Sequence, residues 1–231
     1  MSSAAPLPTH PKVITFDTYG TLIDWDGALR AYLALVFGPA FDVAPFYQRW
    51  YYGHALPAVR DEPFKLYRQL LTDTLLAACA DENLSITPEL ADRLGDVMAD
   101  APPFADTNPV LSVLRRACPL ATISNSQKDI LDASAAKMNH PFTFTITGEV
   151  VGSYKPAAPL FERVLELANA EPHEAVHIAQ SQYVDLPRSV PMGIPTIWIN
   201  RQGQTLRPEH PTPTLELPNL TAVPHALGLA A

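Results

Sequence analysis

The stretch VITFDTYGT, residues 13–21, decides the fold prediction. Its first four residues are β-branched or aromatic and carry no charge, which is typical of a strand buried on both faces. Asp17 ends this run, and a turn containing Gly20 follows. The stretch therefore predicts a buried strand that places a carboxylate at its carboxyl end.

The sequence after this strand changes character twice. Residues 24–105 show mainly helical spacing, with a helix-start signal at Thr87-Pro88-Glu89. From Asn108 onward, strand and helix patterns alternate, which favours a parallel sheet covered by helices on both faces. The predicted strands are 120–123, 142–146, 176–179 and 194–199, and the predicted helices are 108–116, 126–136 with Ser126 as its cap, and 156–168.

These changes predict an α/β core into which a helical segment is inserted. We assign residues 1–22 and 106–231 to the core and residues 23–105 to the insertion, which we call the cap. Residues 1–11 are expected to form a loose tail, and the proline-rich residues 207–224 an extended surface segment. In open parallel sheets, ligands bind beyond the carboxyl ends of the strands, so polar residues there are candidates for the site.

Composition excludes several classes of protein. The chain has 231 residues, of which 47% are hydrophobic and 17% charged, so it can form a core and is not disordered. Its net charge of -8 without a basic run argues against nucleic acid or a membrane surface as partner. The longest apolar run, residues 31–41, is too short to span a bilayer, and residues 1–11 do not resemble a signal peptide. We therefore expect a cytoplasmic protein in which Cys79 and Cys118 are buried thiols.

Four strand ends carry polar groups of complementary chemistry. In a nucleophilic displacement, Asp17 would be the nucleophile and Lys155 would keep it ionised. Ser124 would bind an anionic substrate, and Asp185 would position a water. Taken singly, these residues also have structural interpretations, as turn residues, helix caps or a solvated lysine. Their order on alternating elements favours a shared site.

These segments resemble the motifs of the haloacid dehalogenase (HAD) superfamily. The matching segments are FDTYGTL at 16–22, TISN at 122–125, SYKP at 153–156 and AQSQYVD at 179–185. The resemblance implies a HAD-like Rossmannoid core with a parallel sheet and an inserted helical cap. Phosphatases of the superfamily carry a second aspartate two residues after the nucleophile. Here that residue is Tyr19, which resembles the 2-haloacid dehalogenase branch.

That branch implies a hydrolase acting on carbon–halide bonds. Asp17 would attack the Cα of a short 2-haloalkanoic acid and expel halide, and water would then hydrolyse the aspartyl ester to give a 2-hydroxy acid. The substrate would be a small molecule, and neither a metal nor another cofactor is implied. Members of the branch are often homodimers.

Further candidates come from the same comparison. Tyr19 and Asn125 would bind substrate, as would Gln180 and Gln182, where the family has Ser and Asn. Phe161 stands where a family tyrosine would add its hydroxyl to the Lys–Asp network. These departures leave two alternatives open: a HAD-type phosphatase with an atypical first motif, and a non-catalytic HAD-fold protein that binds a ligand.

The family places an arginine that receives halide on the first cap helix. The same distance from Asp17 reaches Gln48, and its neighbour Arg49 is our candidate. One residue along a helix turns a side chain by about 100°, so Arg60 and Arg68 stay open as substitutes. The aromatic residues between 46 and 52 are expected to wall the halide pocket.

One motif points elsewhere. Residues 173–177 read HEAVH, the pattern of zinc proteases, which requires both histidines on one face of a helix. The run that follows is a strand pattern, so we interpret His177 as a core or edge residue. Asp24, directly after the first motif, is expected to cap a helix.

Overall fold

A parallel sheet of six strands forms the centre of the computed structural model, which describes residues 5–229. The order of the strands is β3-β2-β1-β4-β5-β6, and every neighbouring pair is parallel. This confirms the predicted α/β class. The strands are β1 (Val13–Phe16), β2 (Leu120–Ser124), β3 (Phe144–Thr147), β4 (Ala175–Ala179), β5 (Thr196–Ile199) and β6 (Leu215–Leu217).

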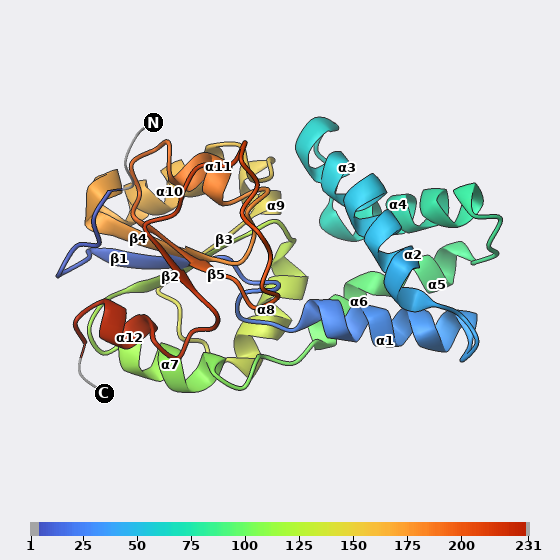
Figure 1. Cartoon of the computed structure of the whole chain (residues 1–231), viewed down its shortest axis with the longest axis horizontal. Coiled ribbons are helices and arrows are strands. Elements are labelled where there is room, and N and C mark those ends of the chain that lie inside the picture. The colour runs from blue at the N-terminus through green and yellow to red at the C-terminus, as the bar shows by residue number, and fades with distance from the viewer. Residues whose placement is uncertain (1–4, 230–231) are drawn as a thin grey trace.

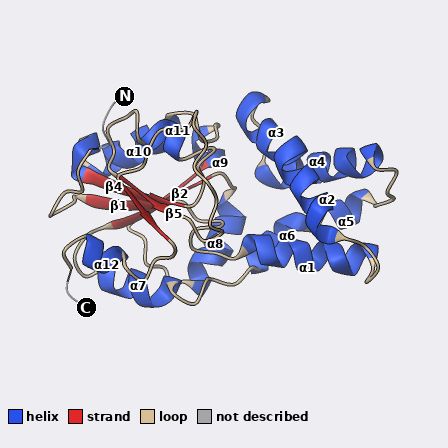
Figure 2. Ribbon diagram, in the orientation of Figure 1, coloured by secondary structure: helices blue, strands red, loops and turns tan. Residues whose placement is uncertain are grey.

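Helices cover both faces of this sheet (Figure 2). One face carries α10 (Pro159–Ala168) and α11 (Leu186–Ser189), and the other carries α7 (Thr107–Leu114) and α12 (Val223–Ala226). The remaining elements of this part are α8 (Lys128–Lys137), α9 (Gly148–Val151) and the 3₁₀ turn η2 (Pro172–Glu174). Because the strands are covered on both sides, β1, β2, β4 and β5 are buried along their whole length.

The cap lies beyond one end of the sheet (Figure 1). Asp24 caps the first helix of the cap by accepting a hydrogen bond from the Gly27 backbone N–H at 3.1 Å. Thr87 caps the helix that starts at Pro88 by accepting the Leu90 backbone N–H at 3.3 Å. Both caps agree with the sequence signals. The helices are α1 (Trp25–Phe37), α2 (Val43–Trp50), the π-helical turn η1 (Tyr51–Ala55), α3 (Leu56–Asp61), α4 (Tyr67–Asp81), α5 (Pro88–Asp92) and α6 (Leu94–Asp100).

Two connectors join the cap to the rest of the chain, and they run side by side. Ile23 in the outgoing connector forms an antiparallel bridge with Pro103 in the returning one. Arg201 fixes this ribbon from the end of β5. Its guanidinium donates to the Thr21 carbonyl at 2.9 Å and to both carboxylate oxygens of Asp106 at 2.9 and 3.1 Å.

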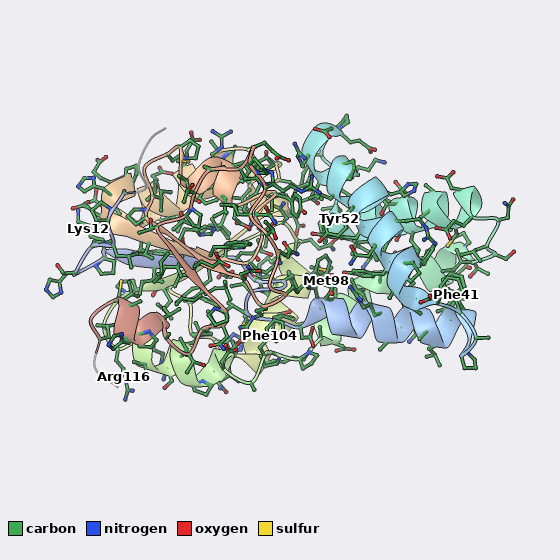
Figure 3. All side chains as sticks on the ribbon, viewed as in Figure 1. Lys12, Phe41, Tyr52, Met98, Phe104 and Arg116 are labelled. Atoms are coloured by element: carbon green, nitrogen blue, oxygen red, sulfur yellow. The ribbon has the colours of Figure 1, made fainter. Side chains whose placement is uncertain are left out.

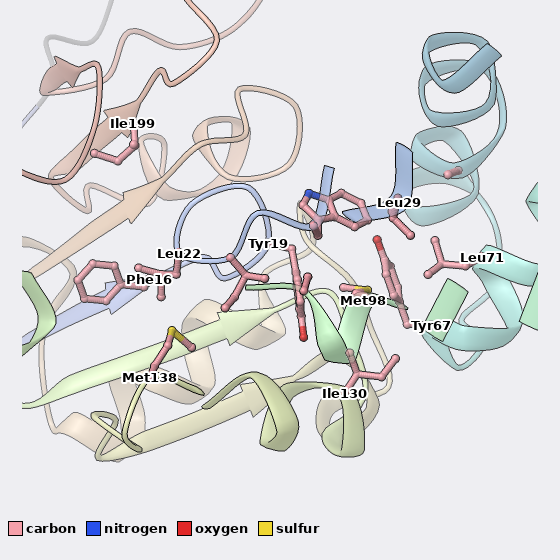
Figure 4. Close-up of a cluster of buried hydrophobic side chains, with 14 of the residues drawn as sticks. Phe16, Tyr19, Leu22, Leu29, Tyr67, Leu71, Met98, Ile130, Met138 and Ile199 are labelled. Carbon is pink, nitrogen blue, oxygen red and sulfur yellow. The ribbon is translucent and has the colours of Figure 1, made fainter. Parts of the chain in front are cut away.

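A continuous hydrophobic cluster extends from the sheet into the cap (Figure 4). Phe16 and Leu22 lie at its sheet end, Tyr19 lies in the middle, and Tyr67 and Leu71 come from α4. The cap is therefore packed against the core through apolar side chains. The two cysteine thiols, as expected, are free and buried.

The structure corrects some element boundaries. β6 was not predicted: it is a three-residue edge strand within the segment expected to be merely extended. The helix expected to start with Ser126 begins at Lys128, and the Ser126 hydroxyl donates to Ser124 instead of accepting a backbone N–H of the helix. Residues 1–4 of the predicted tail lie outside the described residues. None of the described helices has both the length and the apolarity needed to cross a membrane.

Candidate active site

Three charged side chains from separate elements form one buried chain of ion pairs. The Lys155 ammonium donates to Asp17 Oδ1 and to Asp185 Oδ1, each at 2.8 Å. Asp17 follows β1, Asp185 precedes α11, and Lys155 lies in the loop after α9. The structure thus brings together the charged residues that the sequence placed at separate strand ends.

The turn after β1 fixes the Asp17 carboxylate. Gly20 has a φ of 89°, a conformation that glycine adopts without strain, and the chain then returns so that the Thr21 hydroxyl donates to Asp17 Oδ2 at 2.8 Å. The same hydroxyl accepts the Gln180 backbone N–H at 2.8 Å. Both oxygens of Asp17 therefore have hydrogen-bond donors.

Asn125 orients the lysine through its backbone. Its side-chain oxygen accepts from the Lys155 N–H at 2.7 Å, and its amide nitrogen donates to the Lys155 carbonyl at 3.0 Å. Ser124, one residue earlier, accepts the Ser126 hydroxyl at 3.0 Å. The Ser124 hydroxyl hydrogen is consequently free for a group in the cavity that this residue lines.

The three charges perturb each other's protonation. Burial raises the pKa of Asp17, and the repulsion of Asp185 adds to this, so the pKa stays above its ordinary value although Lys155 and Thr21 pull it down. Burial alone would also raise the pKa of Asp185, but Lys155 and the hydrogen bond from His177 bring it below its ordinary value. For Lys155, burial opposes charge, and the two carboxylates together still raise its pKa. The lysine is thus held as a cation.

A small cavity of about 40 Å³, room for a few waters, lies between this charged floor and the cap. Its floor is formed by Asp17, Lys155, Ser124 and Asn125. Its roof consists of apolar and aromatic side chains, namely Tyr51, Ala55, Leu56, Val59 and Tyr67 from η1, α3 and α4. An arginine is absent from the described residues that line it.

Tyr19 lines the cavity at the position two residues after Asp17. Its hydroxyl is 3.0 Å from the Ser134 hydroxyl, and burial raises its pKa well above the ordinary value. The phenol is therefore neutral and anchored, and it is unsuited to the acid role that an aspartate would have at this position.

An adjoining cavity of about 230 Å³ shares Trp25, Tyr51 and Gln180 with the first. Gln48 and Arg30 also line it. Tyr52, which extends from the cap toward the core in Figure 3, completes the wall of this adjoining cavity. The centroid of its ring lies 5.5 Å from that of Tyr183. Two of the predicted features are thus present here: Gln180 at the site and the aromatic wall between residues 46 and 52.

Two predicted substrate-binding residues, Arg49 and Gln182, do not line the cavity that contains Asp17. Arg49 points out from the cap, where its guanidinium binds both carboxylate oxygens of Glu82 at 2.6 and 2.8 Å. Arg68, the alternative, pairs with Asp92 and Asp96. Gln182 is buried, but its amide holds the 204–210 loop through Gln204, Thr205, Arg207 and His210.

Some residues of the site were missed by sequence reasoning. Thr21 belongs to the first motif, and its place beside Asp17 could have been inferred from the turn. His177 was correctly expected in a strand rather than in a metal-binding helix, but its imidazole also touches the charged chain, 3.0 Å from Asp185 Oδ1. The partner lies eight residues further on, after a turn, so strand periodicity could not reveal it.

The family is decided by a sequence comparison: residues 11–186 match the model for haloacid dehalogenase-like hydrolases. The chain belongs to this hydrolase family. The Asp17–Lys155–Asp185 chain lies at the sheet edge where the HAD resemblance had placed the reactive residues.

Individual relatives agree with this family. The chain is 26% identical over 210 residues to an (S)-2-haloacid dehalogenase of Pseudomonas putida, covering 90% of this chain and 92% of the relative. A crystal structure of a dehalogenase with an intermediate complex superposes with a TM-score of 0.85 at 20% identity, over 97% of this chain and 100% of the other. An L-2-haloacid dehalogenase from Xanthobacter autotrophicus, with chloropropionic acid covalently bound, gives 0.80 at 18% identity, over 96% and 100%. The structural matches establish the shared fold.

Proposed function

We propose that this protein hydrolyses the carbon–halogen bond of a short 2-haloalkanoic acid through an aspartyl-ester intermediate. The observation that carries the proposal is the Asp17 carboxylate, paired with Lys155 at 2.8 Å, at the floor of a small cavity with an apolar roof. Tyr19, in place of a second aspartate, supports carbon–halogen over phosphate chemistry. The relatives named as 2-haloacid dehalogenases add further support.

The first half-reaction forms the ester. An oxygen of Asp17 attacks the substrate Cα, and the halide leaves with the bonding electron pair, so no proton transfer is needed. Lys155 keeps the carboxylate ionised and oriented. The free hydroxyl hydrogen of Ser124 binds the substrate carboxylate, while Asn125 holds the lysine backbone in place.

The second half-reaction regenerates the enzyme. Water attacks the carboxyl carbon of the Asp17 ester while Asp185 accepts one of its protons. The ester C–O bond on the acyl side then breaks, and Asp185 returns this proton to the leaving alkoxide oxygen. The second proton of the water passes from the Asp17 carboxyl group to solvent. The 2-hydroxy acid then leaves and Asp17 is again a carboxylate. Lys155, which touches both carboxylates, neutralises the charge that develops on the carbonyl oxygen.

Other parts of the assignment remain proposals as well. We propose that residues 23–105 act as a separate cap domain, whose roof side chains restrict the length of the substrate. We also propose a cytoplasmic location and a homodimer; light scattering of the purified protein tests the latter.

Halide release from chloroacetate and from L- and D-2-chloropropionate tests the function. We expect release from at least one of them. A single turnover in ¹⁸O water, with enzyme in excess, should leave the label on Asp17 and not on the hydroxy acid. Magnesium-dependent hydrolysis of a phosphate ester without halide release would show a phosphatase instead, and ligand binding without either activity would show a non-catalytic protein.

A further inference from the structure

His177 extends the charged chain beneath the cavity by one more residue. Its imidazole is fully buried within β4, where Nε2 lies 3.0 Å from Asp185 Oδ1 and Nδ1 lies 2.8 Å from the Thr15 hydroxyl. An ionised carboxylate only accepts hydrogen bonds, so Nε2 carries the hydrogen that faces Asp185. The Thr15 hydroxyl, which also donates to the Val176 carbonyl at 3.3 Å, is the hydrogen-bond partner of Nδ1 and fixes the ring from its other side.

The hydrogen bonds of the two carboxylates are distributed unequally. Asp17 Oδ1 accepts from Lys155 and Oδ2 from Thr21. Asp185 Oδ1 accepts twice, from Lys155 and from His177. Asp185 Oδ2 is buried and has no partner among the described residues. Of the four oxygens, it is the one without a hydrogen-bond donor among the described residues.

A buried acceptor without a partner is uncommon in folded proteins, and a catalytic role is one physical explanation for it. In the proposed function, the group that must deliver a proton to Asp185 is the water of the second half-reaction. A second donor on Oδ1 holds the carboxylate in the rotation that leaves Oδ2 for that water.

We infer that His177 is a positioning residue for ester hydrolysis, acting through Asp185. The inference rests on the proposed function and deepens it, because it separates the two half-reactions. The His177 side chain hydrogen-bonds to Thr15 and Asp185 and is not among the residues that line the cavity, so formation of the ester does not depend on it directly.

The neighbouring Phe161 supports this assignment. Its ring meets the imidazole edge-on, with ring centroids 5.0 Å apart. Phe161 packs against the ring that contacts Asp185 and helps to hold the imidazole in place.

Two substitutions separate this role from simple core filling. His177→Met fills the space without a donor, whereas His177→Gln places an amide N–H near the position of Nε2. Halide and 2-hydroxy acid are measured by rapid quench in a first turnover with the substrate that the wild-type enzyme uses best. The mass of the Asp17 peptide reports the ester.

We expect His177→Met to slow hydrolysis by about 10- to 100-fold while ester formation changes by less than about 3-fold. One halide per active site would then appear before the hydroxy acid, and the ester would accumulate. His177→Gln should restore hydrolysis to within about 10-fold of the wild type. Equal slowing of both steps, or no slowing of either, would overturn the inference.

Thr15→Val keeps the test decisive if His177→Met does not fold. It removes the hydroxyl that fixes Nδ1 and nearly conserves shape, so hydrolysis should slow by about 3- to 10-fold with ester formation unchanged. An unchanged rate of hydrolysis in a folded Thr15→Val enzyme would contradict the role of the ring. Failure of the wild-type enzyme to release halide from any short 2-haloacid would instead refute the proposed function itself.

Discussion

The floor and the roof of the cavity are built from opposite kinds of side chain. The floor and the buried Asp185 beneath it remove two carboxylates and an ammonium from water, and these groups hydrogen-bond to each other, to Thr21 and to His177. The roof is apolar and aromatic, and the cap directs charges such as Arg49 away to its outer surface. Under the proposed function, this difference places the chemistry in the core and the selection of substrate in the cap.

The two regions also differ in what their ion pairs contribute. The Arg49–Glu82 pair is open to solvent, and such pairs are weak because water and salt screen them. Lys155 is fully buried between two carboxylates, so its removal leaves charges without compensation. Substitutions in the floor should therefore affect both activity and folding, whereas substitutions in the roof should affect which substrates are accepted.

Asp17→Asn tests the floor most severely. An amide is a far weaker nucleophile than a carboxylate, so halide release should fall by about 10⁴-fold or more. Because the side chains are nearly isosteric, the midpoint of thermal unfolding should change little. Substantial residual turnover would mean that water attacks the substrate directly and that Asp17 is at most a general base.

Lys155→Met should be almost as damaging to activity and more damaging to folding. Two buried carboxylates would then face each other without a cation, which costs about 3–5 kcal/mol of unfolding free energy. Urea denaturation at neutral pH measures this loss. A Lys155→Met variant as stable as the wild type would show that Asp17 and Asp185 are not both ionised in the folded protein.

Thr21→Val probes the pH dependence. Only the ionised form of Asp17 attacks the substrate. Burial raises the pKa of Asp17 above 3.8, so kcat/KM should already decline at pH values higher than 3.8 as the pH is lowered. Loss of the Thr21 hydrogen bond, which lowers this pKa, should move the acidic limb to higher pH. The pH profile of kcat/KM for both enzymes checks the direction, and a limb that moves down would be inconsistent with it.

Val59→Leu narrows the roof without touching a charge. We expect the ratio of kcat/KM for 2-chlorobutanoate to that for chloroacetate to fall by about 10-fold. In a tight apolar pocket, one methylene group typically changes the discrimination between substrates by about this factor. Val150→Leu, on an exposed residue of α9, is the matched control and should leave the ratio unchanged. The same ratio in both variants would place the size limit outside the roof.

Arg49→Ala should have the smallest effect. Since the guanidinium binds Glu82 on the outer surface of the cap, halide release should change by less than about 2-fold. A loss of 10-fold or more would show that the roof contributes a charge after all, and would restore Arg49 as a halide ligand.

The sequence predicted the floor better than the roof for a physical reason. The positions of Asp17 and Ser124 are set by the strands that they end, and that of Lys155 by a short motif in the loop after α9. Parallel strands bring their carboxyl ends to the same side of the sheet, so these residues meet there. The direction of Arg49 could not be read from the sequence, because one residue along a helix turns a side chain by about 100° and the surface pair with Glu82 leaves no trace in the local pattern. Gln182 and β6 depend on contacts with the 204–217 segment, which are long-range and irregular.

The ribbon of Ile23 and Pro103 has a consequence for how the chain folds. It closes a loop of about 80 residues, and each doubling of loop length costs only about 0.6 kcal/mol of closure entropy. Closing this loop therefore costs about 2.5 kcal/mol more conformational entropy than closing a five-residue hairpin. Arg201 ties both ends of the insertion to the sheet, so β1 and β2 can pair as though a short turn joined them.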